Sequence, residues 1–160
     1  PGHTFIASAA AINHLGAKPI LADCSQDHLI DPKSIEQKLS KNTKAIMPVQ
    51  LNGRVVNMDP ILEIAKKNNL LILEDSCQAL GATFRGKYAG TFGIAGAFSF
   101  YPSKTLGCFG DGGAVITDSN QLAEEIRLIR DHGRDPKDGK VKRTNSISCK
   151  HLQIREFTKS

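Results

Sequence analysis

The sequence predicts an α/β fold in which helices cover both faces of a largely parallel sheet. Short apolar runs alternate along the chain with amphipathic segments of about ten residues, a pattern typical of strands joined by helices. One of these runs, LLILED, is apolar almost to its end, as expected for a strand buried on both faces. The 160 residues, 40% hydrophobic and 23% charged, have the length and composition of about one globular domain.

Helix-capping residues and apolar spacing place the elements of the first half. TFIASAAAINHLG, residues 4–16, predicts a helix of small residues that ends at Gly16. Asp31 followed by Pro32 predicts the cap and first turn of a second helix over 32–40. Strands are predicted over residues 18–23 and 43–50.

The second half continues the alternation. Asp59-Pro60 repeats the cap-and-proline start and predicts a helix that ends near residues 66–69. Asp118 is expected to cap a further helix that stops at Gly133. Strands are predicted over residues 70–75, 95–100 and 113–117, and the clear periodicity is lost after Gly133.

The net charge of +5 belongs to the end of the chain. Residues 134–160 hold eight Lys and Arg against three Asp and Glu, whereas residues 1–133 hold thirteen of each. No helical spacing and no interleaved aromatic residues accompany the basic excess, so we expect a basic, poorly defined tail and no nucleic-acid-binding face.

The cysteines and the apolar runs indicate a cytoplasmic protein without a membrane span. Cys24, Cys77, Cys108 and Cys149 lie far apart with no C-x-x-C pair, which predicts reduced thiols and neither a disulfide framework nor a zinc site. No apolar run reaches the roughly 18 residues of a membrane helix, and the first residues lack the basic start of a signal peptide.

Polar residues that follow predicted strands are the candidates for a site, because α/β sheets bind ligands beyond the carboxyl ends of their strands. Asp75 ends LLILED, Ser99 lies near the end of AGAFSF, and Lys104 lies in the glycine-rich loop that follows. Pyridoxal phosphate requires a lysine for its aldehyde, a carboxylate for its ring nitrogen, donors for its phosphate and a face against its ring. Phe5 is a candidate for the ring face.

Competing interpretations of the same residues stay open at this point. Lys104 could be a surface lysine, Asp75 the N-cap of a helix in SCQALG, Ser99 an ordinary strand residue and Phe5 part of the core. Other motifs fail on spacing: GCFGDGG is not followed by the Lys-Ser/Thr of a P-loop, its glycines do not open a helix after a strand, and G-x-S-x-G is absent.

Two sequence blocks, EDSCQALGA and SFYPSK, occur in this order between TKAIMPVQLNGRVVNMDPI and LAEEIRLIRDHGR. With them the chain resembles the DegT/DnrJ/StrS family of sugar aminotransferases from Thr4 to about Arg134. The resemblance implies part of the large domain of the aspartate aminotransferase superfamily, a three-layer α/β/α fold with a mixed, mostly parallel sheet. It also implies pyridoxal 5'-phosphate as cofactor, a keto nucleotide sugar as substrate, glutamate or glutamine as amino donor, and a homodimer.

The resemblance implies a role for each of five residues. Lys104 would form the internal aldimine and shuttle a proton, and Asp75 would pair with the pyridine nitrogen. Gln78 would lie beside the ring, Ser99 would bind the phosphate, and Phe5 would stack on the ring. Related dehydratases carry histidine at the position of Lys104, which favours transfer of an amino group.

The resemblance also divides the chain. Residues 1–133 are expected to form part of the cofactor-binding large domain, and residues 134–160 the basic tail, where NSISCKHLQIREFTKS keeps only scattered letters of the family pattern. The family's phosphate-binding turn lies before the first residue of this sequence, and its small domain lies after the last. Two alternatives stay open: a non-catalytic remnant, and an enzyme of the same fold with another substrate, such as an aminohydroxybenzoate synthase.

Overall fold

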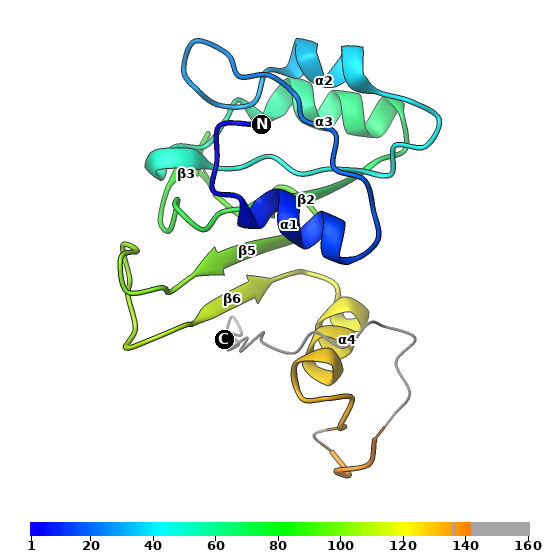
Figure 1. The fold of residues 1–160 in the computed structure, drawn as a ribbon, viewed down its shortest axis with the longest axis vertical. Helices are drawn as coiled ribbons and strands as arrows, with labels where there is room; N and C mark the ends of the chain where they lie inside the picture. Colours follow the sequence, from blue (N-terminus) through cyan, green and yellow to red (C-terminus); the bar gives the residue numbers. More distant parts are fainter. Residues whose placement is uncertain (136, 142–160) are drawn as a thin grey trace.

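A four-stranded mixed sheet forms the centre of the computed structural model, which describes residues 1–135 and 137–141. Its strand order is β1-β2-β5-β6, and the first three strands run parallel while β6 is antiparallel to β5 (Figure 1). This confirms the predicted mixed, mostly parallel sheet. The strands are β1 (Ala45–Ile46), β2 (Leu71–Asp75), β5 (Ala95–Ser99) and β6 (Gly113–Ile116).

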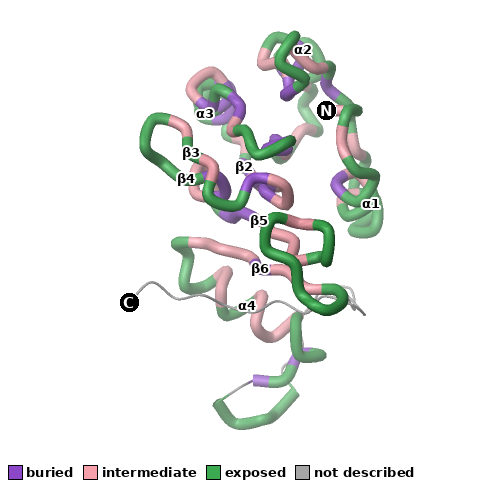
Figure 2. Tube along the Cα trace, turned by 90° about the vertical axis from the view of Figure 1, so that its left-hand side faces the viewer, coloured by how far each residue is buried: buried purple, intermediate pink, exposed green. Residues whose placement is uncertain are grey.

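Helices cover both faces of this sheet. Figure 2 shows α1 and α3 on opposite sides of β2, so the three layers implied by the sequence are present. The helices are α1 (Ala7–His14), α2 (Pro32–Lys38), α3 (Met58–Lys67) and α4 (Asn120–Arg130), with one short 3-10 turn, η1 (Leu51–Gly53).

The hydrophobic core lies between α3 and the sheet. Four α3 residues, Met58, Ile61, Ile64 and Ala65, are buried at helical spacing, and the first two have no exposed surface. They belong to one apolar cluster with residues of α2 and of strands β1 and β2. Because burying each large apolar side chain stabilises a fold by about 1.5–3 kcal/mol, this face fixes α3 against β2.

Side-chain caps start α2, α3 and α4, although two of these caps differ from the prediction. The Asp31 carboxylate accepts a hydrogen bond from the Lys33 N–H at 3.0 Å, as expected. For α3, however, the cap is Asn57 rather than Asp59, and for α4 it is Ser119 rather than Asp118. In both cases the neighbouring polar residue can also accept a backbone N–H, so the sequence alone places such helix starts only to within one or two residues.

Two predicted strands are shorter or missing. Residues 18–23 are wrongly predicted as a strand: they form no ladder, and Ile20 and Leu21 are more than half exposed. The strand predicted over 43–50 is reduced to β1 and an isolated bridge between Val49 and Asp75, because Pro48 has no N–H to donate to a ladder.

A small hairpin was not predicted from the sequence. Its strands are β3 (Thr83–Phe84) and β4 (Lys87–Tyr88), joined by Arg85 and Gly86. Both turn residues have positive φ, 50° and 76°, which is the conformation of a two-residue hairpin turn. The glycine in FRGK was the available signal.

The buried carboxylate of Glu74 holds the end of β2 to the segment that precedes β5. Glu74 is 2% exposed and accepts four hydrogen bonds. They come from the Gln50 amide at 3.0 Å and from the backbone N–H groups of Gly90 at 2.8 Å, Phe92 at 2.5 Å and Gly93 at 3.0 Å. A buried carboxylate with this many donors fixes every segment that it contacts.

The close approach of two backbone segments at Gly96 gives a stability prediction. A Cβ at Gly96 would lie 2.3 Å from both the Cα and the carbonyl oxygen of Gly90. We therefore expect Gly96→Ala to lower the free energy of unfolding by about 1–3 kcal/mol, measured by urea denaturation. Gly2→Ala is the matched control, because its Cβ would meet only an ordinary contact at 3.9 Å; equal stability of the two variants would contradict the close approach.

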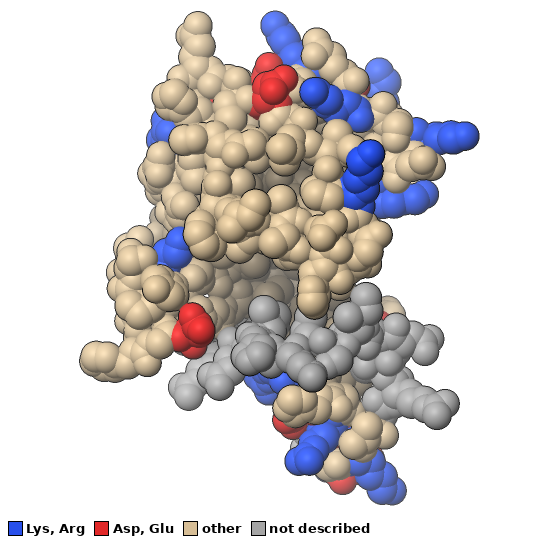
Figure 3. Space-filling model, in the orientation of Figure 1, with Lys and Arg blue, Asp and Glu red and all other residues tan. Residues whose placement is uncertain are grey.

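Charged side chains are unevenly distributed over the face shown in Figure 3. Lys and Arg side chains gather over α2 and the segment after it, whereas the middle of the face carries no charged side chain. Helix α1, which lies across this middle, contains no Lys, Arg, Asp or Glu. No helix within the described ranges is long and apolar enough to cross a membrane.

Most of the predicted basic tail lies outside the described residues, as do Cys149 and the segment NSISCKHLQIREFTKS. The division of the chain at residue 133 therefore stays a prediction. The described cysteines, Cys24, Cys77 and Cys108, have free thiols.

Candidate functional site

Asp75 lies at the carboxyl end of β2, where its carboxylate contacts two different parts of the chain. The Ser8 hydroxyl of α1 donates a hydrogen bond to Oδ2 at 2.6 Å, and the backbone N–H of Cys77 donates to Oδ1 at 3.2 Å. Residues 76–81, all described, form turns rather than the helix that Asp75 could have capped. Asp75 thus keeps the local N–H contact of a cap and adds a contact across the fold.

Ser99 and Lys104 come from the next strand of the sheet. Asp75 pairs with Ala97 of β5, so Ser99 lies two residues further toward the same end of the sheet. The Ser99 hydroxyl oxygen accepts a hydrogen bond from the Tyr101 N–H at 3.2 Å, and the Lys104 N–H donates to the Tyr101 carbonyl at 2.9 Å. Lys104 is half-buried, unlike an ordinary surface lysine.

The loop that carries Lys104 is folded tightly on itself. Gly107 lies so close to Pro102 that a Cβ there would be 2.5 Å from the Pro102 carbonyl oxygen. The Cys108 thiol contacts the carbonyl oxygens of Phe100 at 2.9 Å and Gly110 at 3.1 Å. The glycines after Lys104 therefore allow close backbone packing beside the end of β5.

Gln78 and Phe5 approach the same end of the sheet from other segments. The Gln78 side-chain oxygen accepts a hydrogen bond from the N–H of Asn52 at 3.1 Å, and Asn52 has a positive φ of 54°. Phe5 directly precedes α1, and its carbonyl oxygen accepts the N–H of Ser8 at 3.3 Å. The Phe5 residue is 68% exposed, so its alternative interpretation as a core residue is wrong.

Cys77 links Asp75 and Lys104 electrostatically. The pKa of its thiol is raised from 9.0 to about 12, mainly by burial and also by the Asp75 charge and a hydrogen bond with Asp75. The positive charge of Lys104 acts in the opposite direction and lowers this pKa. The charges of Asp75 and Lys104 therefore act on the same thiol in opposite directions.

This arrangement predicts slow alkylation of Cys77. With a pKa near 12, little of the thiol is ionised at pH 9, where an ordinary cysteine is half ionised. Asp75→Asn removes the negative charge, so the pKa should fall and alkylation should become faster. Timed iodoacetamide labelling with peptide mass analysis checks this, with the exposed Cys108 as internal control; an unchanged Cys77 rate in Asp75→Asn would contradict the predicted coupling.

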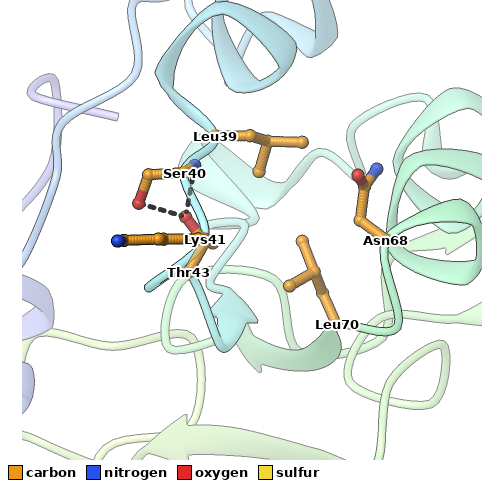
Figure 4. A pocket seen from close by; sticks show the side chains of 6 residues that line it. All are labelled: Leu39, Ser40, Lys41, Thr43, Asn68 and Leu70. Carbon is orange, nitrogen blue, oxygen red and sulfur yellow. Dashed lines mark hydrogen bonds between the residues drawn. The ribbon is translucent and has the colours of Figure 1, made fainter.

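A separate hollow lies away from these residues. Figure 4 shows it between the segment after α2 and the segment between α3 and β2, with a rim formed by Leu39, Ser40, Lys41, Thr43, Asn68 and Leu70. Ser40 and Thr43 hydrogen-bond to each other in this hollow rather than facing a ligand. It contains no pair of groups suited to acid–base chemistry, and the candidate site remains at the ends of β2 and β5.

Solved structures of aminotransferases share the fold of this chain. DesV of Streptomyces venezuelae, solved in complex with a ketimine intermediate, superposes with a TM-score of 0.81 at 39% sequence identity over 96% of this chain and 40% of that chain. NtdA of Bacillus subtilis, solved with bound cofactor PMP, superposes with a TM-score of 0.80 at 36% identity over 89% of this chain and 32% of its own.

The chain belongs to the DegT/DnrJ/EryC1/StrS aminotransferase family, whose model matches residues 1–157. This match confirms the predicted family and extends past Arg134, where the resemblance was expected to end. A curated relative, the dTDP-3-amino-3,4,6-trideoxy-alpha-D-glucose transaminase of Streptomyces venezuelae, is 44% identical over 148 residues. The alignment covers 91% of this chain but 39% of the relative, so the chain spans about two-fifths of that relative's length.

Ser8 is the residue of this site that the sequence did not predict. It lies in the run ASAAA, where it is the one polar side chain among alanines. A hydroxyl in an otherwise apolar helix segment, one turn after Thr4, was the available signal. What the sequence lacked was any indication that α1 lies across the end of β2.

Proposed function

We propose that this chain forms the pyridoxal phosphate-binding core of an aminotransferase that converts a keto nucleotide sugar into an amino sugar. The observation that carries the proposal is the placement of Asp75 and Lys104 beyond two adjacent parallel strands, with Cys77 within electrostatic range of both. Parallel α/β sheets bind ligands at this end. The relative that makes a dTDP-linked amino sugar and the solved structures of the same fold support this choice of reaction.

The residues present suit this cofactor. Oδ2 of Asp75 accepts a hydrogen bond from Ser8 and Oδ1 accepts one from the Cys77 N–H, and a carboxylate with about four lone-pair sites keeps acceptor capacity for a protonated ring nitrogen. The Ser99 oxygen accepts from Tyr101, so its own proton is available to a phosphate oxygen. Within residues 1–135 and 137–141, no hydrogen bond or ion pair engages the Lys104 ammonium group, which would hold the cofactor aldehyde.

When bound, pyridoxal phosphate supplies a conjugated ring that accepts the electron pair released at a substrate carbon. The Asp75 carboxylate would keep the ring nitrogen protonated and so favour that acceptance. The Lys104 amine would carry a proton between the substrate carbon and the cofactor carbon. Gln78 would border the ring, and Phe5 would cover one ring face.

In a complete cycle, glutamate or glutamine would give up its amino group and leave as the corresponding 2-oxo acid. The nucleotide sugar would exchange its keto oxygen for this amino group, and the full exchange neither consumes nor releases water. We further propose that the protein acts as a homodimer in the cytoplasm; the free thiols of Cys24, Cys77 and Cys108 suit a reducing compartment.

The test is stepwise reconstitution. The purified chain is mixed with pyridoxal phosphate and followed by visible absorption, then given glutamate and assayed for 2-oxoglutarate, and finally given a 4-keto or 3-keto dTDP sugar and analysed by mass. Uptake of cofactor with release of 2-oxoglutarate supports an aminotransferase. No uptake would contradict the proposal and favour a non-catalytic remnant, whereas 2-oxoglutarate without an amino sugar would favour another acceptor substrate.

A further inference from the structure

Ser8 is placed to fix the orientation of the Asp75 carboxylate. Ser8 lies in α1 and is 8% exposed. Its hydroxyl reaches the Asp75 carboxylate at the end of β2, 67 residues away in the sequence. A serine inside a helix normally bonds to a carbonyl of the preceding turn or faces solvent. Here the distance to the carboxylate, 2.6 Å, is clearly shorter than the 3.3 Å to the Phe5 carbonyl.

The hydrogen-bond geometry settles which way the protons point. Ser8 has one hydroxyl proton, and a distance of 2.6 Å is typical of a hydroxyl that donates to a carboxylate. Its oxygen also lies 3.3 Å from the Thr4 hydroxyl, where either atom could donate. Because the Ser8 proton is directed at Asp75, Thr4 must donate to Ser8, and the two hydroxyls form a chain that ends on Oδ2.

The other oxygen of the carboxylate is held from the opposite side. The Cys77 N–H donates to Oδ1, so Asp75 is fixed between α1 and the turn after β2. Rotation of the carboxylate about its Cβ–Cγ bond would therefore distort both hydrogen bonds. Phe5, the residue proposed to cover the ring, directly precedes the turn of α1 that contains Ser8. The same segment therefore carries Phe5 and the donor to Asp75.

We infer that Ser8 is a positioning residue that holds the Asp75 carboxylate in the orientation needed by the ring nitrogen of the cofactor, with Thr4 as its donor. The inference rests on the proposed function, because it concerns the same site. It extends that function from the residues expected to touch the cofactor to a helix that the sequence pattern did not connect with Asp75.

The contact itself is tested without cofactor by a double-mutant cycle. The free energies of unfolding of the unaltered chain, Ser8→Ala, Asp75→Asn and the double variant give the coupling between the two side chains. A hydrogen bond to a charged group predicts a coupling of about tenfold or more in the unfolding equilibrium constant. Additive effects of the two substitutions would overturn the inference whatever the cofactor does.

The positioning role is tested with pyridoxal phosphate and pyridoxamine phosphate as probes. Ser8→Ala should weaken the binding of both by about tenfold and move deprotonation of the bound pyridoxamine phosphate ring, read from its ultraviolet band, to lower pH. Ser8→Thr, which keeps the hydroxyl, should restore both quantities. Asn13→Ala, an exposed residue of the same helix, is the control for a general effect on α1.

The outcomes separate the two proposals. If the unaltered chain binds the probes and Ser8→Ala changes neither their affinity nor the titration of the ring, the positioning role alone is overturned. Absence of binding by the unaltered chain would overturn the proposed function and the positioning role with it. If Ser8→Ala weakens binding of the probes and Ser8→Thr does not restore it, the Ser8 hydroxyl is not the group that positions Asp75, and the inference is overturned.

Discussion

Lys104→Ala is expected to abolish covalent capture of pyridoxal phosphate at the proposed site. In the unaltered chain, borohydride reduction of the mixture should fix the label on the Lys104 peptide, because its half-buried amine has no competing partner among the described residues. The alanine variant should show label only on exposed lysines and at a low level. Since a positioned proton-transfer group contributes roughly 10²–10⁴-fold to a rate, any amine transfer should fall by at least about 100-fold.

The control for this experiment is Lys41→Ala. Lys41 is exposed and lies at the hollow beside α2, remote from β5 in the sequence and in the fold. It should keep the visible absorption band and the Lys104 label of the unaltered chain. The assignment of Lys104 is wrong if the two variants retain the same band and the same pattern of labelled peptides.

Glu74→Ala is expected to produce the largest loss of stability in the described fold. It removes the acceptor of three backbone N–H groups and of the Gln50 amide, all close to a side chain that is 2% exposed. Donors left unsatisfied in the interior each cost about 1–3 kcal/mol, and water entering the new space recovers part of that cost. We expect a net loss of about 3–5 kcal/mol, a large fraction of the roughly 5–15 kcal/mol of a typical domain.

Urea denaturation followed by circular dichroism measures this loss. Glu74→Gln should fall between the unaltered chain and Glu74→Ala, because the amide keeps one oxygen as acceptor but turns an NH₂ group toward N–H donors. Glu63→Ala, on the exposed side of α3, should stay within about 0.5 kcal/mol of the unaltered chain. A Glu74→Ala midpoint close to that of Glu63→Ala would mean that the four hydrogen bonds contribute little.

The order of strands and helices was predictable because local patterns encode it. LLILED and AGAFSF became β2 and β5 with nearly the predicted bounds, since apolar runs between turn residues have few alternatives. The structure of residues 18–23 was not predictable, because a strand needs a neighbouring strand to hydrogen-bond with. An apolar run does not reveal whether such a neighbour is present. The predicted caps of α3 and α4 were wrong by one or two residues, because neighbouring polar residues can accept the same backbone N–H groups.

The candidate site was predictable where its residues follow strands, and unpredictable where it depends on contacts across the fold. Asp75 and Lys104 are marked by position in the chain, and their roles toward a cofactor stay predictions. Ser8 acquires its partner only when α1 reaches the end of β2. No spacing rule connects residues 8 and 75, so a hydroxyl in an alanine run gave no direction toward its acceptor.

The adjacent acids Glu74 and Asp75 bind different parts of the chain. Glu74 accepts hydrogen bonds from the segment before β5, and Asp75 accepts one from α1. Successive side chains of a strand face opposite sides of the sheet, so the length of β2 decides which acid meets which partner. Deleting one residue within residues 71–73 would move Asp75 to the interior position of Glu74 and bring Ser76 to the site, whereas adding one would bring Glu74 to the site and Leu73 to the interior position. In a library of variants, this strand should therefore accept exchanges among apolar residues but no change in length.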